Sequence, residues 1–292
     1  MSRICFLSMD VEDAEAFFVY DDMLIPDFNA SGYEVETVSW RSTTVNWNDF
    51  DHVIVRSPWD YQQAPEAFIA CLEAIDASSA TLHNPLSLMK WNIEKTYLRE
   101  LAENDVPIVP TVWADTYSAT WFEAQFAALG CDEVVIKPAL SANSDDTFRV
   151  PQSQAGEFHG KLSALFKDRL LMVQPFLNSV ITEGEYSLFY FGGEYSHTLL
   201  KQPKAGDFRV QEEHGGRLSA YTPTADMLTV CEAALDAMPT DYLYARVDLI
   251  RVDGHWAIME LELIEPSLYF NIDPTSPKRF VDVFVTRFGK GH

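Results

Sequence analysis

Three carboxylates near the C-terminal end of the sequence have the residue types and the spacing that a magnesium site needs. In the segment 259–263 (MELEL), Glu260 and Glu262 alternate with apolar residues, so on a β-strand both side chains point to one face. Asp248 interrupts an apolar run, and a turn at 253–254 (DG) would fold the two stretches into a hairpin that places Asp248 opposite the glutamates. Three carboxylates on one face make a hard-oxygen site suited to Mg²⁺. Alternation is also the usual pattern of a strand with one solvent-facing side, and for Glu260 and Glu262 alone that alternative stays open.

Two lysines stand where a polyphosphate would need positive charge. The chain has 44 acidic and 21 basic residues and a formal net charge of -23, so any phosphate site must concentrate its few cations or use metal ions. Lys95 lies in a predicted helix, and Lys137 ends an apolar strand directly before Pro138, a position from which its ammonium group can point into a cleft. The alternative for each lysine alone is a stem that covers apolar surface while the charged end stays in water.

A third pattern suits a flat heterocycle. The segment 171–177 (LMVQPFL) is an apolar strand that breaks after Gln174, and such a break can offer main-chain groups to a base and the side chains of Phe176 and Leu177 to its faces. Glu185 follows at the start of the next predicted strand, where its carboxylate could accept hydrogen bonds from ribose hydroxyls. In isolation this pattern has little specificity.

Further candidates lie at a loop and at the end of an N-terminal strand. Lys201, Arg209 and Gly216 surround the predicted loop 202–214, and an arginine there can grip a phosphoryl group or a carboxylate in a bidentate fork. A solvated loop arginine is the alternative. The remaining candidates lie at the carboxyl end of a buried strand. Ligands favour this end of parallel strands, so these residues are predicted to contact the substrate. They are Arg56, Trp59 and Asp60.

These residues require a particular series of elements to position them. Short apolar runs and one helical pattern before residue 85 predict a small α/β unit with a parallel sheet. A single helix is predicted over 87–104, and the rest of the chain predicts strands and helices that end in a meander. The predicted strands are 4–9, 33–40, 52–56, 108–114, 133–137, 170–174, 186–191, 195–200, 245–251 and 256–263, and the other predicted helices are 65–77, 122–129, 154–166, 226–237 and 278–288.

Composition excludes several classes of protein. With 47% hydrophobic and 13% aromatic residues the chain is globular, and its acidity argues against a nucleic-acid partner or an anionic membrane. The four cysteines are widely separated, so neither a disulfide framework nor a structural zinc is expected. The first residues contain too short an apolar run for a signal peptide, so we expect a cytoplasmic protein.

The order and spacing of the candidate residues resemble the ATP-grasp superfamily over about residues 86–270. The closest resemblance is to the branch around D-cycloserine synthetase and prokaryotic glutathione synthetase, carried by 55–61 (VRSPWDY), 137–142 (KPALSA), 207–209 (DFR) and 260–269 (ELELIEPSLY). The resemblance implies a parallel α/β domain at 1–85, followed by a two-lobed grasp at 86–177 and 178–292. One departure is Glu262, which stands where the family usually has asparagine and adds a negative charge to the metal site.

The resemblance also implies roles for the candidate residues. Lys95, Lys137 (42 residues later) and Ser141 would bind the phosphates of ATP, and Gln174, Phe176, Leu177 and Glu185 would bind its nucleoside. Asp248, Glu260 and Glu262 would hold two Mg²⁺ ions, Arg209 and Lys201 would be catalytic, and Arg56, Trp59, Asp60 and Gly216 would contact the substrate.

The implied activity is an ATP-dependent ligase that phosphorylates a small carboxylate or ureido-type substrate and couples it to an amine or another nucleophile. The expected partner is a small molecule, and a homodimer is common in this superfamily. The alternatives are a non-catalytic nucleotide-binding protein with the same fold, or a kinase-like member that stops at the phosphorylated product.

Overall fold

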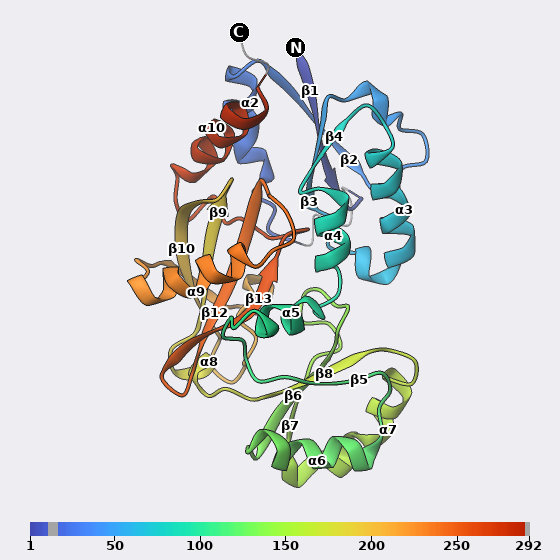
Figure 1. Cartoon of the computed structure of the whole chain (residues 1–292), viewed down its shortest axis with the longest axis vertical. Helices are drawn as coiled ribbons and strands as arrows, with labels where there is room; N and C mark the ends of the chain where they lie inside the picture. Colours follow the sequence, from blue (N-terminus) through green and yellow to red (C-terminus); the bar gives the residue numbers. More distant parts are fainter. Residues whose placement is uncertain (11–16, 290–292) are drawn as a thin grey trace.

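The computed structural model describes residues 1–10 and 17–289 and contains three β-sheets (Figure 1). The first sheet has the strand order β2-β1-β3-β4 and is parallel throughout, as the sequence predicts. The short fourth strand was not predicted. The strands are β1 (Ser2–Ser8), β2 (Tyr33–Ser39), β3 (His52–Ser57) and β4 (Thr81–His83).

Both faces of this sheet are buried, which explains the continuous apolar run in β1. Cys5 and Leu7 pack on the side of α3 (Pro65–Asp76), whereas Ile4 and Phe6 pack on the side of α2 and α10. A strand covered on both faces needs apolar residues at every position instead of alternate ones. The helices around the sheet also include α2 (Ile25–Ala30), α4 (Leu86–Asn92) and α10 (Ser276–Phe288).

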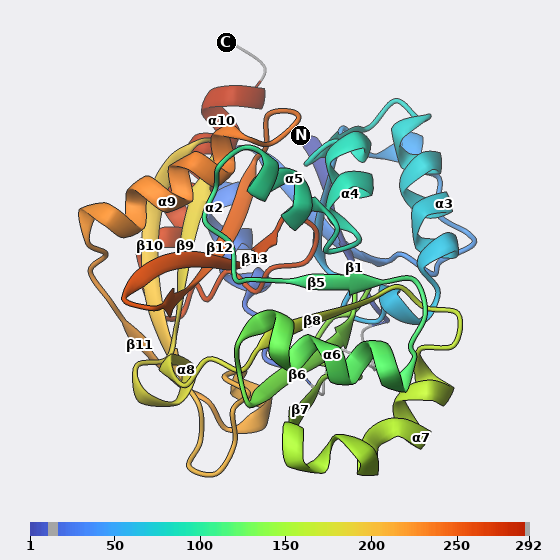
Figure 2. The ribbon, with the colours of Figure 1, turned by 60° about the horizontal axis from the view of Figure 1, so that its bottom comes forward.

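The second sheet lies at the far end of the molecule from the termini, with the order β5-β8-β6-β7 (Figure 2). All its pairs are antiparallel, and α6 and α7 cover one face. The other face is therefore left for Lys137 and Gln174, which point away from the two helices. The elements are β5 (Val112–Ala114), α6 (Ala119–Leu129), β6 (Glu133–Pro138), β7 (Phe148–Pro151), α7 (Ala155–Leu165) and β8 (Leu171–Pro175).

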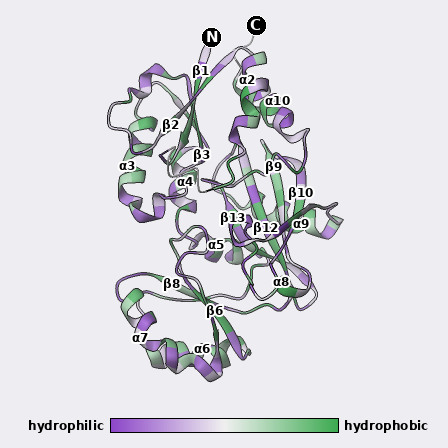
Figure 3. Cartoon of the chain, turned by 180° about the vertical axis from the view of Figure 1, so that it is seen from behind, coloured by the Kyte–Doolittle hydropathy of each residue, from purple (hydrophilic) through white to green (hydrophobic). Residues whose placement is uncertain are grey.

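The third sheet is antiparallel with the order β11-β10-β9-β12-β13. The hairpin of β12 and β13 turns at 253–254, and its register pairs Asp248 with Glu260 and Arg246 with Glu262, so the predicted placement of Asp248 is confirmed. Hydrophobic residues are concentrated in the strands, while α6 and α7 contain both hydrophobic and hydrophilic residues (Figure 3). The elements are α5 (Tyr97–Glu103), α8 (Ser179–Thr182), β9 (Glu185–Phe191), β10 (Glu194–Gln202), β11 (Arg217–Ala220), α9 (Ala225–Asp236), β12 (Tyr244–Val252) and β13 (His255–Glu262).

The single helix predicted over 87–104 is wrong, because α4 ends at Asn92 and α5 begins at Tyr97. Tertiary contacts interrupt it. The side chain of Asn92 binds both the carbonyl of Leu261 (2.8 Å) and the amide of Leu263 (2.9 Å) in the last strand region. The amide of Lys95 donates to Ala139 O at 2.9 Å, so it cannot continue a helical ladder. Lys95 therefore lies in the break between two helices.

The predicted domain boundaries at 85 and 177 stay predictions. The first sheet ends before residue 85, but α10 contributes Phe280 and Phe284 to the core beneath it. Residues from both ends of the chain therefore share one core. Among the described residues, no helix has both the length and the hydrophobicity that crossing a membrane requires.

Asn84 joins the first sheet to the third. Its Nδ2 donates to the carbonyls of Tyr244 (2.9 Å) and Leu263 (2.7 Å), and its Oδ1 accepts from the amide of Leu243 (2.7 Å). The residue is 1% exposed and has a φ of 56°, in the left-handed region. Asparagine tolerates that conformation better than most residues.

We expect Asn84→Ala to lower the free energy of unfolding by about 3 kcal/mol, because three buried main-chain groups lose their partners. Urea unfolding followed by circular dichroism measures the loss. Asn84→Gly separates backbone strain from hydrogen bonding, since glycine accepts the positive φ but makes no side-chain bonds. The exposed Asn104→Ala is the control, and a loss from Asn84→Ala no larger than its loss would contradict the role of Asn84.

Candidate active site

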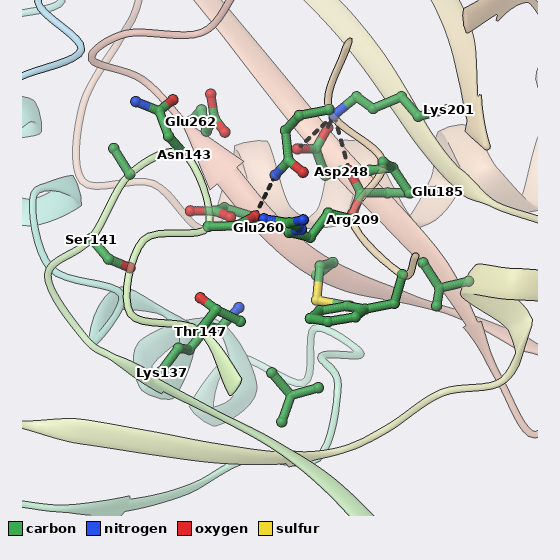
Figure 4. Close-up of a pocket in the computed structure, with 18 of the residues that line it drawn as sticks. Lys137, Ser141, Asn143, Thr147, Glu185, Lys201, Arg209, Asp248, Glu260 and Glu262 are labelled. Atoms are coloured by element: carbon green, nitrogen blue, oxygen red, sulfur yellow. Dashed lines mark hydrogen bonds and ion pairs between the residues drawn. The ribbon is translucent and has the colours of Figure 1, made fainter. Parts of the chain in front are cut away.

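One cavity between the second and third sheets contains most of the predicted site residues. The two ammonium groups and the three carboxylates, which are far apart in the sequence, open onto the same space. Figure 4 shows the loop after Lys137 on one side of this cavity and the carboxylates of the third sheet on another. The predicted residues that line it are Trp59, Lys95, Lys137, Ser141, Gln174, Phe176, Leu177, Glu185, Lys201, Arg209, Asp248, Glu260 and Glu262.

The two lysines reach the cavity from different elements. Lys95 Nζ, from the break between α4 and α5, contacts Glu260 Oε1 at 2.8 Å and donates to Ser141 O at 2.7 Å. Lys137 is the second-last residue of β6 and is 9% exposed, and within the described chain no carboxylate lies at ion-pair distance from its ammonium group. Burial lowers the pKa of Lys137, although Glu260 opposes this shift. A buried ammonium group without an ion-pair partner is costly unless an anion joins it.

The three carboxylates already have cationic neighbours. Asp248 contacts Arg246 NH2 at 3.0 Å and Lys201 Nζ at 3.4 Å, and Arg246 also binds Glu262. In the described residues no group of three carboxylate, histidine or cysteine side chains is arranged to hold a metal ion. A metal ion would therefore have to displace the arginine and lysine from these oxygens. Their donor type fits Mg²⁺, and each already lies next to a positive charge.

The charges in this cluster shift one another's ionisation. Burial raises the pKa of Glu262 to about 8, with Asp248 and Glu260 adding to the shift and Arg246 opposing it. For Asp248 burial works in the same direction, but Arg246 and Lys201 outweigh it and lower its pKa. Glu262 is thus the carboxylate of this group whose charge changes close to neutral pH.

Lys201 and Glu185 form a buried pair at the floor of the cavity. Lys201 Nζ lies 2.9 Å from Glu185 Oε1 and also reaches Asp248, as the dashed lines in Figure 4 show. Ser187 donates a hydrogen bond to Asp248 from the same side. Within residues 1–10 and 17–289, only one of the two Glu185 oxygens has a partner.

The apolar part of the cavity surrounds the break after β8. Phe176 and Leu177 line it together with Val135, Ile250 and Met259, a set that suits the faces of a flat ring. Gln174 is held next to them, since its Nε2 donates to Thr111 Oγ1 at 3.0 Å.

A loop over residues 139–147 closes one side of the cavity without glycine. Asn143, Ser144 and Asp146 have φ values of 54°, 58° and 53°, a conformation that glycine usually supplies. Contacts to other parts of the chain hold the loop in place. Asn143 Nδ2 donates to Trp59 O at 3.2 Å, and Gln211 Nε2 donates to Ser144 Oγ at 2.6 Å. Serine and asparagine side chains, and not glycine backbone, therefore make the contacts that hold this loop.

Arg209 lines the cavity but is engaged within its own loop. Its Nε and NH2 lie 3.1 Å and 2.8 Å from the carboxylate of Asp207, and this hydrogen bonding lowers the pKa of Asp207. Its third nitrogen has no partner in the described part of the chain.

Three predicted substrate contacts lie outside this cavity. Arg56 is 1% exposed, pairs with Asp21 and donates to Pro266 O, so the structure places it between elements and not in the cavity wall. Asp60 lines a second cavity next to the first and accepts from Trp40 Nε1 at 2.7 Å and Arg41 Nε at 2.6 Å.

Gly216 lines neither cavity. A Cβ there would lie 2.0 Å from Val210 O, so the glycine serves a close backbone approach and gives no support to its predicted substrate contact.

Arg246, Glu265 and Tyr269 also line the cavity, and the sequence did not predict them as site residues. Arg246 lies two positions before Asp248 on the same strand face, so alternation along β12 could have placed it. Glu265 and Tyr269 lie in the irregular segment after β13, where no periodic pattern exists to place them. Burial raises the pKa of Glu265 to about 7, and a hydrogen bond with the Tyr61 hydroxyl opposes this shift.

Comparisons with known proteins agree with this architecture. Residues 4–84 match the family described as D-cycloserine synthetase DcsG, N-terminal domain. The cycloserine biosynthesis protein DcsG of Streptomyces lavendulae is 30% identical over 294 residues, covering 95% of this chain and 97% of that protein.

Solved structures extend the similarity. The crystal structure of D-cycloserine synthetase DcsG has a TM-score of 0.87 at 28% identity, covering 98% of this chain and 99% of that chain. A RimK domain protein ATP-grasp from Sphaerobacter thermophilus DSM 20745 has a TM-score of 0.70 at 16% identity, covering 97% and 99%. The D-alanine–D-alanine ligase of Bacillus anthracis complexed with ATP has a TM-score of 0.71 at 15% identity, covering 98% and 97%, and these last two show the fold alone. The chain is an enzyme that belongs to the ATP-grasp ligases, in the family of D-cycloserine synthetase.

Proposed function

We propose that this enzyme uses ATP and two Mg²⁺ ions to phosphorylate a small carboxylate or ureido-type substrate and to couple it to an amine or another nucleophile. The observation that carries the proposal is Lys137, a buried ammonium group that faces the cavity and has no ion-pair partner among the described residues. A phosphate would supply the missing negative charge in a molecule that otherwise repels anions.

The rest of the cavity suits ATP in one orientation. The apolar walls at Phe176 and Leu177 would hold the base, and the free oxygen of Glu185 would accept a ribose hydroxyl. The phosphates would then extend towards Lys95 and Lys137, under the loop that carries Ser141.

Asp248, Glu260 and Glu262 would hold the Mg²⁺ ions, which neutralise the charge of the phosphates when bound. Arg246 and Lys201 contact Asp248 and Glu262, and Lys95 contacts Glu260, so these three cations would lie next to the transferred phosphoryl group. Arg209, with one nitrogen unengaged, would bind the phosphorylated substrate before a nucleophile displaces phosphate. Positioning and charge neutralisation account for most of such a transfer.

A screen for ADP release tests the reaction class. The purified enzyme with ATP and Mg²⁺ is incubated with amino acids, hydroxy acids and ureido compounds, and mass spectrometry follows the products. ADP, phosphate and a joined or cyclised product are expected. ADP with a stable phosphorylated compound would show a kinase, and absence of substrate-dependent ADP release would contradict the proposal.

We expect Lys137→Ala to weaken the binding of the ATP analogue AMPPNP by about 10-fold or more, because it removes charge-assisted hydrogen bonds to phosphate. Isothermal titration calorimetry with Mg²⁺ present measures the affinity. The exposed Lys167→Ala makes the same change in net charge and should bind as the wild type does. Equal affinity in the wild type and both variants would show that Lys137 does not bind the phosphates.

We expect Mg²⁺-dependent AMPPNP binding to strengthen about threefold to fourfold between pH 7.5 and pH 9, because Glu262 must lose its proton before it can bind a cation. Binding at pH 7.5 should also release protons, which calorimetry detects in buffers of different ionisation enthalpy. Glu262→Gln should abolish this part of the pH dependence, and the exposed Glu103→Gln should keep it. An unchanged profile in Glu262→Gln would mean that another group titrates.

A further inference from the structure

The cavity wall after β13 is an irregular segment whose carbonyls are held by side chains. Residues 263–268 belong to no strand or helix, yet each of their six carbonyls lies within hydrogen-bond distance of a donor on a different residue. Buried carbonyls outside a sheet need such partners, because water does not reach them. The donors are Asn84 to Leu263 O (2.7 Å), Trp59 to Glu265 O (2.8 Å), Arg56 to Pro266 O (3.1 Å), Arg246 to Ser267 O (3.4 Å) and His197 to Leu268 O (3.1 Å), while Ile264 O (3.0 Å) shares the single proton of the Tyr244 hydroxyl with Val55 O (2.7 Å).

The donors come from the N-terminal part of the chain and from the third sheet. Arg56, Trp59 and Asn84 belong to the N-terminal part, while His197, Tyr244 and Arg246 belong to strands of the third sheet. This explains why Arg56, predicted to contact substrate, instead lies buried behind the wall.

His197 holds the last of these carbonyls through a chain of hydrogen bonds with a defined direction. Leu268 O can only accept, so His197 Nε2 carries the proton, and Nδ1 of the neutral ring accepts from Ser196 Oγ at 2.9 Å. Ser196 Oγ in turn accepts from Arg279 Nε at 3.1 Å. Burial lowers the pKa of His197 to about 4, so the ring stays neutral at pH 7.

The next residue, Tyr269, has a backbone conformation that needs support. Its φ is 46°, in the left-handed region that costs a bulky residue of order 1 kcal/mol or more. His197 binds the carbonyl of the peptide that joins Leu268 to Tyr269, and it stacks on Phe189 at 4.2 Å. Phe189 in turn meets the Tyr269 ring edge-on at 6.3 Å.

Tyr269 is part of the cavity wall close to the cationic cluster. It lines the cavity, is 6% exposed, and lies near enough to Lys201 and Arg246 for both to act on its ionisation. A rotation of the peptide between residues 268 and 269 would change the φ of Tyr269, and with it the direction in which the side chain leaves the backbone.

We propose that His197 is a positioning residue of the ligase site, because its hydrogen bond to the carbonyl of Leu268 keeps Tyr269 in the left-handed conformation and its phenol in the cavity wall. His197 itself is not among the residues that line the cavity. The proposal rests on the proposed function only in naming the cavity as the ligase site.

Hydrogen exchange tests the role of His197 without a known substrate. His197→Phe keeps a flat ring for stacking on Phe189 but removes the donor. We expect the amides of 264–270 to exchange about 10-fold faster in this variant, while those of β9 and β12 keep their wild-type rates. His197→Gln is the matched rescue, because its side-chain amide can donate from a position close to that of Nε2, and its exchange should stay near that of the wild type.

Two results would overturn the proposal. One is wild-type exchange over 264–270 in His197→Phe, and the other is equally fast exchange in β9 and β12, which would mean that the residue only stabilises the fold. AMPPNP binding with Mg²⁺ to the wild type is measured alongside. Absence of that binding would contradict the ligase site itself, whereas binding with an unaltered exchange pattern would contradict the positioning role alone.

Discussion

Charged groups buried inside a protein are stable only when other charges or hydrogen bonds compensate them, and this requirement shapes the cavity between the second and third sheets. Arg246 and Lys201 neutralise Asp248, and Lys95 neutralises Glu260. Lys137 has no such partner in the described chain. In a chain with a net charge of -23, these few cations are gathered where a polyphosphate and its metal ions would lie. The sheets and the segments between them bring these groups to one cavity.

Each of these two sheets presents its charged and polar site residues on the face opposite its covering helices. Helices α6 and α7 cover one side of the second sheet, so Lys137 and Gln174 point to the other. The third sheet packs α5 and α9 against one face and presents Asp248 and Glu260 on the opposite one. Strand alternation thus separates core from site, and the cavity forms where the two polar faces meet.

Hydrogen bonds from side chains to main-chain groups hold the segments of the cavity wall that lie outside the sheets. Asn92 interrupts a helix in order to bind the last strand region, and this places Lys95 next to Glu260. Asn84 and Trp59 bind the segment after β13 from the N-terminal part of the chain. Such bonds tie the position of the N-terminal sheet to the shape of the cavity, so a displacement of one would change the other.

The sequence by itself determined the strands and helices whose apolar residues repeat with a regular period, and with them the fold class. It also determined which charged residues could serve ATP and metal ions, because a lysine at a strand end and an aspartate inside an apolar strand are visible without coordinates. Only the tertiary structure decided the break at Lys95, the burial of Arg56 and the cavity wall at Glu265 and Tyr269. These features depend on hydrogen bonds between residues separated by as many as 210 positions, as between Arg56 and Pro266, and local periodicity carries no information about such contacts.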